Sequence, residues 1–237
     1  MKKFILIFIL FPVVAFSQTD VYTVYGQGVQ AFYRQDYTEA IYHFNSSIDF
    51  KEDFMLGYYY RGLSYKNINN FDEAIKDFTK VLSLDSTYKD AIVKRAETFM
   101  LVKKYTDAAN DYEKLIVFNP EYYLFYKEIG LCYYYMRKYE LADIAYSNYL
   151  AIATEDYETH FKRGMTNFYA NNFKQAIEDF TTVLSLKPEY LSALDMRGQS
   201  YQRYNLIDNA CQDWESARKK GYSYAQENFV KFCKEEE

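Results

Sequence analysis

The sequence predicts an all-α protein, an α-solenoid in which six helix–turn–helix units stack on one another. Two observations lead to this fold class. The 237 residues include only 8 glycines and 3 prolines, too few turn-forming residues for a protein of many short strands. Two segments, Ile75–Asp85 and Ile177–Lys187, are nearly identical and lie three periods of 34 residues apart. A repeat of this length is typical of arrays of helical hairpins.

The 34-residue period runs through six units without an insertion or a deletion. One position is alanine in every unit: Ala40, Ala74, Ala108, Ala142, Ala176 and Ala210. Twelve positions earlier each unit has a small residue: Gly28, Gly62, Ala96, Gly130, Gly164 and Gly198. Four positions after the alanine each unit has an aromatic residue: Phe44, Phe78, Tyr112, Tyr146, Phe180 and Trp214. Small residues let helices approach closely, and each hairpin buries its apolar stripe against the next one.

These residues and their spacing resemble the tetratricopeptide repeat over about residues 21–224. The resemblance implies a right-handed solenoid in which the first helix of each repeat lines a concave groove. We expect a signal peptide at 1–17, repeats at 21–54, 55–88, 89–122, 123–156, 157–190 and 191–221, and a capping helix with a tail at 222–237. The last segment ends in a charged run, as expected for a terminal helix that faces solvent.

The first seventeen residues are typical of a secretory signal peptide. Lys2 and Lys3 precede an apolar run, Phe4–Phe16, that is shorter than the ~20 residues needed to span a bilayer as a helix. The run ends in a small-x-small pattern, so we expect cleavage before Gln18 and an exported protein, periplasmic or secreted. In the alternative, an uncleaved anchor, this segment is the protein's membrane contact. The formal net charge of −5 argues against a nucleic-acid partner, which needs clustered Lys and Arg.

The groove positions implied by the resemblance carry aromatic and apolar side chains. They define a candidate peptide-binding groove: Tyr22, Tyr25, Phe32, Tyr59, Leu63, Met100, Lys127, Leu131, Tyr134, Phe161, Met165 and Phe168. Consecutive helical residues point about 100° apart. Of the triplet Tyr133–Tyr135 we therefore expect Tyr133 in the core, Tyr134 in the groove and Tyr135 at its edge. In the alternative, the rings pack on one another and fill a tightly wound solenoid.

Arginine and aspartate vary together among the repeats, which predicts structural ion pairs between the two helices of a repeat. Repeats two, three, five and six carry the candidate pairs Arg61–Asp77, Arg95–Asp111, Arg163–Asp179 and Arg197–Asp213. Repeats one and four lack both partners. A forked guanidinium matches a carboxylate well in such a position.

Three cysteines follow the expected signal peptide. Cys211 in the last repeat and Cys233 in the cap are 22 residues apart, and export implies an oxidising compartment. We therefore predict a structural disulfide between them; the alternative is two small buried residues. Cys132 lies at a position that other repeats fill with Ser or Thr, so we expect it to be small and buried.

No residue pattern indicates catalysis, a cofactor or a metal. The two histidines, His43 and His160, lie on regular repeat positions, and no Cys/His metal-ligand spacing occurs. Gly26-Gln27-Gly28 lacks the third glycine of a dinucleotide-binding loop. We expect a non-enzymatic scaffold or adapter that binds a peptide or protein segment of unidentified sequence in its groove. The alternatives are a structural subunit of a cell-envelope complex and a periplasmic assembly or secretion chaperone.

Overall fold

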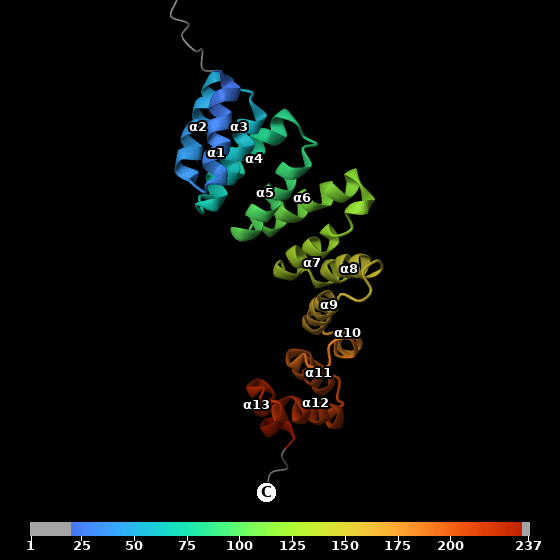
Figure 1. Cartoon of the computed structure of the whole chain (residues 1–237). Helices are drawn as coiled ribbons and strands as arrows, with labels where there is room; N and C mark the ends of the chain where they lie inside the picture. The colour runs from blue at the N-terminus through green and yellow to red at the C-terminus, as the bar shows by residue number, and fades with distance from the viewer. Residues whose placement is uncertain (1–19, 234–237) are drawn as a thin grey trace, which may run out of the picture.

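The structure, a computed structural model, describes residues 20–233 and is helical throughout this range (Figure 1). The helices are α1 (Val21–Tyr33), α2 (Tyr37–Phe50), α3 (Met55–Asn67), α4 (Phe71–Leu84), α5 (Lys89–Leu101), α6 (Tyr105–Phe118), α7 (Phe125–Tyr135), α8 (Tyr139–Leu150), α9 (Tyr157–Tyr169), α10 (Phe173–Leu186), α11 (Leu191–Arg203), α12 (Ile207–Lys219) and α13 (Ser223–Phe232). A short 3₁₀ helix, η1 (Pro120–Tyr122), precedes α7. The predicted all-α solenoid is confirmed.

Each helix packs mainly on the helix before it and the helix after it, so the chain follows a curved path from α1 to α13 (Figure 1). Odd-numbered helices also touch across repeats, α1 with α3, α3 with α5 and α9 with α11. In Figure 1, α7 and α9 lie on the inner side of the curve, whereas α8 and α10 lie on its outer side. The first helices of the repeats therefore form the inner surface.

The core repeats with the sequence period, because each buried aromatic ring lies against the small residue of the preceding helix. A Cβ atom placed on Gly130 would lie 2.7 Å from the ring of Tyr146, and one on Gly198 would lie 2.6 Å from Trp214 Nε1. Both rings are buried, with exposed fractions of 0% and 1%. The glycines are needed because only a bare backbone allows this approach.

All six turns between the two helices of a repeat contain one residue in the left-handed region. They are Gln35, Asn69, Lys103, Arg137, Asn171 and Asn205, with φ between 58° and 66°. In the second repeat the N–H of Asn70 donates to the carbonyl of Tyr65 at 2.9 Å, and that of Asn69 to Lys66 at 3.1 Å. This arrangement ends a helix by pairing its last carbonyls. Because the same turn recurs, the repeats share one hairpin geometry.

The four predicted Arg–Asp pairs lie together in the structure, and each arginine also reaches a third helix. Nη2 of every one of these arginines lies 2.7 Å from an Asp Oδ1. Nη1 donates to the last helix of the preceding repeat: Arg61 to Asn45, Arg95 to Thr79, Arg163 to Ser147 and Arg197 to Thr181. Each guanidinium therefore joins two repeats as well as the two helices of its own.

The regular ladder of Arg–Asp pairs is interrupted in the fourth repeat. Ile129 and Ala145 replace Arg and Asp there, and α7 begins at Phe125, after the 3₁₀ turn. The side chain of Asn119 accepts the N–H of Glu121 at 2.9 Å and so caps this turn. A proline at the first position of the turn fits its fixed φ and its missing N–H.

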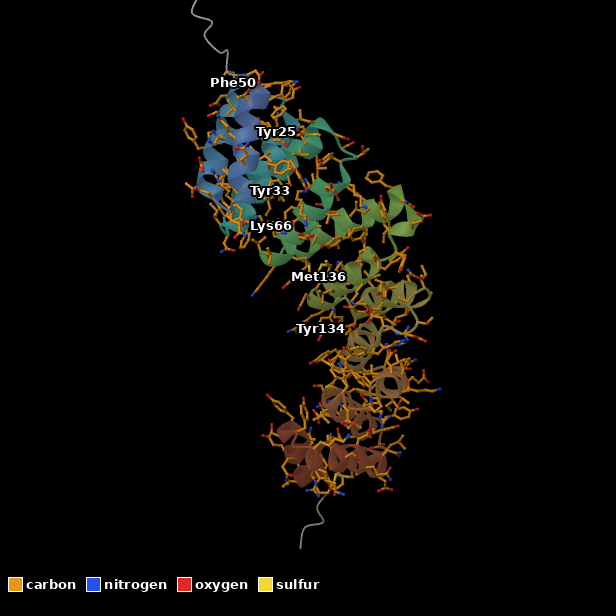
Figure 2. The ribbon with its side chains drawn as sticks, in the orientation of Figure 1. Tyr25, Tyr33, Phe50, Lys66, Tyr134 and Met136 are labelled. Carbon is orange, nitrogen blue, oxygen red and sulfur yellow. A yellow bond between two sulfur atoms is a disulfide. The ribbon has the colours of Figure 1, made fainter. Side chains whose placement is uncertain are left out.

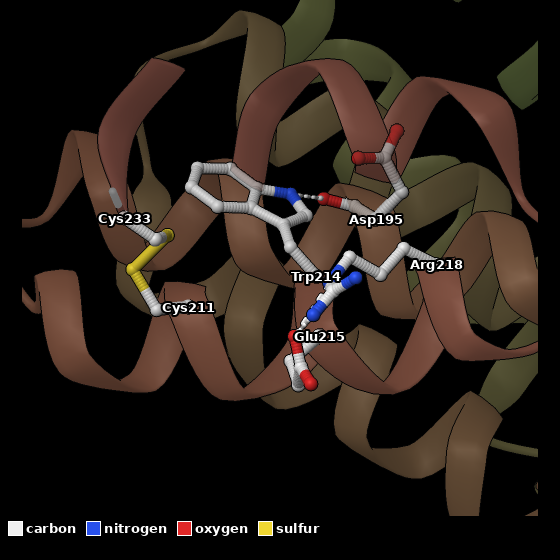
Figure 3. The surroundings of a disulfide bond; sticks show 6 residues. All are labelled: Asp195, Cys211, Trp214, Glu215, Arg218 and Cys233. Carbon is white, nitrogen blue, oxygen red and sulfur yellow. Dashed lines mark hydrogen bonds and ion pairs between the residues drawn. A yellow bond between two sulfur atoms is a disulfide. The ribbon is translucent and has the colours of Figure 1, made fainter. Parts of the chain in front are cut away.

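The cap is α13, and a disulfide joins its end to α12 (Figure 3). Cys211 and Cys233 are bonded, with their Cα atoms 5.7 Å apart. The ring of Phe232 stacks on Trp214, and the Arg218 guanidinium lies 4.4 Å from the ring centroid of Phe229. Cys132 is a buried free thiol. The apolar face of the last repeat is thereby covered.

Within residues 20–233 no helix combines the length and the apolar character that crossing a membrane requires. The expected signal peptide and its cleavage site lie outside these residues.

Candidate functional site

The inner surface of the solenoid carries aromatic side chains in repeats one, two, four and five. Figure 2 labels Tyr25, Tyr33 and Tyr134, which lie toward the inner side of the curve. Aromatic rings offer large contact area at low cost in side-chain entropy, and tyrosine adds a hydrogen-bonding group. The inner surface is therefore the candidate functional site, and its two halves differ.

The three tyrosines of the triplet point in three directions. Tyr133 donates its hydroxyl to Glu113 of α6 at 2.6 Å, and this bond, with burial, raises the pKa of Tyr133 to about 12. Tyr135 is half exposed and stacks on Tyr105 with 4.9 Å between ring centroids. Tyr134 meets the rings of Tyr135, Tyr139 and Tyr169 edge-on, at 5.8, 6.0 and 6.1 Å between centroids. The three side chains thus leave the helix in different directions, as the 100° step between helical neighbours requires.

In the first two repeats the groove rings pack on one another. The ring of Tyr25 lies 5.2 Å from Phe54 and 5.8 Å from Tyr60, measured between centroids. Tyr59, with only 9% exposure, lies 5.4 Å from Tyr88. Burial raises the pKa values of Tyr25 and Tyr59, so both phenols stay protonated. Tyr59 is thus mostly a core residue, and this half of the groove is largely filled by its own side chains.

In the fourth and fifth repeats a cavity of about 260 Å³ opens between α7 and α9. Its lining combines four predicted groove residues with three others: Leu131, Tyr134, Tyr135, Tyr146, Phe161, Lys162 and Met165. Burial raises the pKa of Tyr134 to about 12, so this phenol is a neutral donor or acceptor at the cavity wall. This end of the groove has room for a ligand group.

The remaining predicted groove residues have other surroundings. Tyr22 is exposed, and its ring meets Phe54 edge-on at 5.8 Å. Phe32 contacts Tyr60, also at an edge. Phe168, at the far end of the groove, lies against Tyr169 and Phe173. The side chains of Leu63 and Met100 are half-buried.

Lys127 is engaged inside the protein. Its Nζ lies 2.9 Å from Asp156 Oδ2, which also accepts the Tyr149 hydroxyl at 2.8 Å. Burial acts to raise the pKa of Asp156, but hydrogen bonds from Lys127, the Thr159 N–H and Tyr149 outweigh it and lower that pKa to about 2. Lys127 therefore holds the start of α9 in place, and Lys162 is the cation that lines the cavity.

His160 sits between two hydrogen-bond acceptors. Its Nδ1 lies 3.2 Å from Asp179 Oδ1, and its Nε2 lies 3.0 Å from the carbonyl of Thr154. Only the imidazolium can donate to both. The bond to Asp179 raises the pKa of His160, while burial and Arg163 oppose the shift.

We expect this histidine to make stability depend on pH. A raised folded-state pKa stabilises the fold fully below the ordinary value of about 6.5, and the contribution is lost as pH rises through the folded value. The free energy of unfolding, measured by urea titration, should therefore fall as pH rises above about 6.5. Leucine occupies the equivalent position as Leu194. His160→Leu should remove the dependence in that window; an unchanged slope would show that another group titrates there.

Sequence reasoning missed two residues of the cavity, Tyr146 and Lys162. Tyr146 was assigned only to the aromatic core position, where most repeats have phenylalanine or tryptophan. Tyr112 occupies the same position in the third repeat and does not line the cavity, so a tyrosine at this position carries no signal of its own. Lys162 follows the groove residue Phe161 and was not itself at a predicted groove position, although it lines the cavity.

The comparisons with known proteins agree with this architecture. Residues 56–88 and 157–190 each match a model of the tetratricopeptide repeat family. The solved structure of MamA is 24% identical, covers 70% of this chain and 96% of its own, and has a TM-score of 0.63. YrrB, described as a TPR protein with an unusual peptide-binding site, is 18% identical over 78% of this chain and 96% of its own, with a TM-score of 0.66.

A third solved structure is the C-terminal part of a TPR repeat-containing protein from Cytophaga hutchinsonii. It is 20% identical, covers 81% of this chain and 77% of its own, and has a TM-score of 0.69. No curated protein matches the sequence. At these identities the likeness shows the fold, and the chain carries tetratricopeptide repeats.

Proposed function

We propose that this solenoid of tetratricopeptide repeats is a non-catalytic adapter that holds an extended segment of a partner protein on its inner surface. The observation that carries the proposal is the apolar cavity between α7 and α9, lined by aromatic groove residues. An apolar hollow with a few polar groups is the usual form of a binding site. The peptide-binding site ascribed to YrrB supports the proposal by likeness of fold alone.

Peptide selection tests this proposal without knowledge of the natural partner. Peptides are selected from a random displayed library on the purified protein, and their affinity is then measured by fluorescence anisotropy. The groove variant Tyr134→Ala/Phe168→Ala should weaken binding by about 30-fold, the effect of removing an anchor worth about 2 kcal/mol. Helicity by circular dichroism must match the wild type.

The matched control lies on the outer side. Leu141→Ala/Ile144→Ala removes two exposed apolar side chains from α8 and should leave the affinity within about twofold. If the outer variant loses binding and the groove variant keeps it, the groove is not the binding surface.

An apolar hollow on the outer side favours a second candidate, a structural subunit of a larger complex. About 420 Å³ lies between α6, α7 and α8, where the Arg–Asp ladder is interrupted. Val117 at its border is 82% exposed, and exposed apolar clusters of this kind mark contact surfaces. Loss of partner binding in the outer variant described above would favour this candidate.

We also propose that the protein is exported and works in the periplasm or outside the cell. The signal-peptide pattern of residues 1–17 and the Cys211–Cys233 pairing support this, because disulfides persist in oxidising compartments. Mass spectrometry of the protein isolated from its source should find Gln18 as the first residue. An intact N-terminus in a cytosolic fraction would contradict export.

A further inference from the structure

Four cationic side chains lie in two neighbouring turns of the solenoid, the one between α5 and α6 and the one between α7 and α8. This basic cluster consists of Lys103, Lys104, Arg137 and Lys138. All four side chains are exposed, and no ion pair engages them within residues 20–233. By contrast, Lys94 and Lys127 of the same two repeats pair with carboxylates. The chain as a whole has a formal net charge of −5, so the cluster is a local reversal of its charge.

The two turns touch each other, which brings the four cations to one place on the surface. The ring of Tyr105 stacks on that of Tyr135 with 4.9 Å between centroids. The hydroxyl of Thr106 lies 3.2 Å from Met136 Sδ. Tyr105 directly follows Lys104, and Met136 directly precedes Arg137, so these contacts lie between the two halves of the basic cluster.

The basic cluster lies at the rim of the cavity between α7 and α9. Tyr134 and Tyr135 line this cavity, and the N–H of Arg137 donates to the carbonyl of Tyr134 at 2.9 Å. Lys162, which has no ion pair within residues 20–233, adds a cation to the lining. The volume of about 260 Å³ is below the range of about 300–1,000 Å³ typical of whole small-molecule sites, so it suits one apolar side chain.

Lys103 and Arg137 occupy a backbone position that favours other residues. Both have a left-handed φ, 60° and 58°, which asparagine adopts more readily than a long side chain does. Three other repeats have asparagine at this position: Asn69, Asn171 and Asn205. Folding alone would therefore favour asparagine in the third and fourth repeats as well.

The other two cations conflict with helix capping. Lys104 and Lys138 are the N-cap residues of α6 and α8, and neither side chain makes a capping hydrogen bond. Lysine has no acceptor for the free N–H groups, and its charge opposes the positive end of the helix dipole. Three other repeats have Asp or Asn here: Asp36, Asn70 and Asn172. Breaking two local rules in each of two neighbouring repeats indicates a role other than folding.

We infer that the basic cluster binds acidic side chains of the partner segment, next to an apolar side chain of that segment seated in the cavity. The inference rests on the proposed function and names the chemistry of the partner. Carboxylates form charge-assisted hydrogen bonds with lysine and arginine. Such exposed pairs select the partner and speed its association, whereas burial of the apolar side chain supplies most of the affinity.

An anionic membrane surface fits these turns less well than an extended segment does. A flat surface would meet the same edge of every repeat, and the first turns of α2, α4 and α12 place carboxylates at that edge. These are Glu39, Asp72, Glu73 and Asp208. An extended segment can contact the third and fourth repeats alone, where four cations outnumber Asp107 and Glu140.

The test starts from peptides selected on the purified protein from a random displayed library. They should be richer in Asp and Glu than the library, with an apolar residue beside the acidic ones. A selected peptide is then compared, by fluorescence anisotropy, with an amide twin in which Asn and Gln replace Asp and Glu. The twin should bind about three- to tenfold more weakly, the effect of losing a few exposed ion pairs, and high salt should reduce the difference.

Lys103→Asn/Arg137→Asn separates binding from folding, because it copies the residue that three other repeats have naturally. The ratio of the two affinities should fall toward one, while the urea concentration at the midpoint of unfolding stays the same or rises. The matched control, Lys80→Gln/Lys114→Gln, removes two exposed cations from α4 and α6. It makes the same change in net charge and should keep the preference for the acidic peptide.

Four results would overturn the inference. They are selected peptides no more acidic than the library, equal affinity for a peptide and its twin, an unchanged preference in Lys103→Asn/Arg137→Asn, and an equal loss of preference in the control. A clear loss of stability in Lys103→Asn/Arg137→Asn would also count against it, because the cations would then serve the fold. Binding to phosphatidylglycerol vesicles that this variant loses, without binding of acidic peptides, would assign the cluster to a lipid surface instead.

The groove variant Tyr134→Ala/Phe168→Ala separates this inference from the proposed function. If selected peptides need the groove residues but show no preference for acidic side chains, the adapter proposal stands and the inference falls. If acidic peptides need Lys103 and Arg137 but not the groove residues, the basic cluster is a binding site and the groove proposal falls. If no peptide binds, both fall.

Discussion

Replacing Asp179 with alanine should lower the free energy of unfolding by about 3–5 kcal/mol, the cost of leaving a buried charge without its partner. The Asp179 carboxylate is buried and accepts from Arg163 at 2.7 Å, and His160 lies 3.2 Å from it. The same arginine reaches Ser147 of the preceding repeat, so the loss should spread across the boundary between repeats four and five. Urea unfolding followed by circular dichroism measures it.

Two further variants make this result specific to the buried pair. The neighbouring Glu178 is exposed, and Glu178→Ala should change stability by less than about 0.5 kcal/mol. The double variant Arg163→Ile/Asp179→Ala copies the pair that the fourth repeat has naturally, Ile129 and Ala145. It should lose less stability than Asp179→Ala alone, because no unpaired guanidinium remains. A stability loss in the double variant equal to the sum of the losses in Arg163→Ile and in Asp179→Ala would contradict a coupled pair.

Removing the disulfide should destabilise the cap by about 3 kcal/mol, as expected for closing a loop of this length. Cys211→Ser/Cys233→Ser leaves α13 held by its packing on Trp214 and Arg218. Because repeats contact only their neighbours, the effect should be local. Hydrogen exchange should accelerate in α12 and α13 and stay unchanged in α1–α8.

Cys132→Ser is the matched control for the disulfide variant. Ser64 and Ser200 occupy the equivalent positions and donate to carbonyls four residues earlier, at 2.8 and 2.7 Å. A serine at position 132 can make the same hydrogen bond, so we expect the free energy of unfolding to change by less than about 1 kcal/mol. If hydrogen exchange in α13 is equally slow in the reduced and the oxidised protein, the Cys211–Cys233 disulfide does not stabilise the cap.

The sequence predicted the fold well because each level of structure repeats with the same 34-residue period. Alanine and glycine at fixed positions mark the helix contacts, and the matching loss of Arg and Asp in repeats one and four identified the ion pairs. The third contact of each arginine was not predicted. Its acceptors are Asn45, Thr79, Ser147 and Thr181. A hydroxyl or amide on an exposed helix carries no signal of its own.

The candidate site was only partly predictable, because the period places residues on the inner surface without fixing how their rings pack. Tyr59 and Tyr134, the fifth and twelfth residues of their repeats, were both predicted to face the groove, yet Tyr59 is buried among its neighbours and Tyr134 borders a cavity. This difference depends on how adjacent repeats stack, and the stacking is determined by side chains that lie far apart in the sequence. The left-handed turn residues were likewise missed, since only three of six are asparagine.

Site-specific photo-crosslinking tests the central claim, that the inner surface between α7 and α9 holds a partner segment. A photoreactive phenylalanine derivative is placed at Tyr134 in one variant and at Ile144 on the outer side in another. Both are irradiated in cells that make the protein, and the adducts are identified by mass spectrometry. The account predicts a discrete protein adduct from position 134 and none from position 144. An adduct from position 144 alone would contradict it and would assign the outer face as the binding surface.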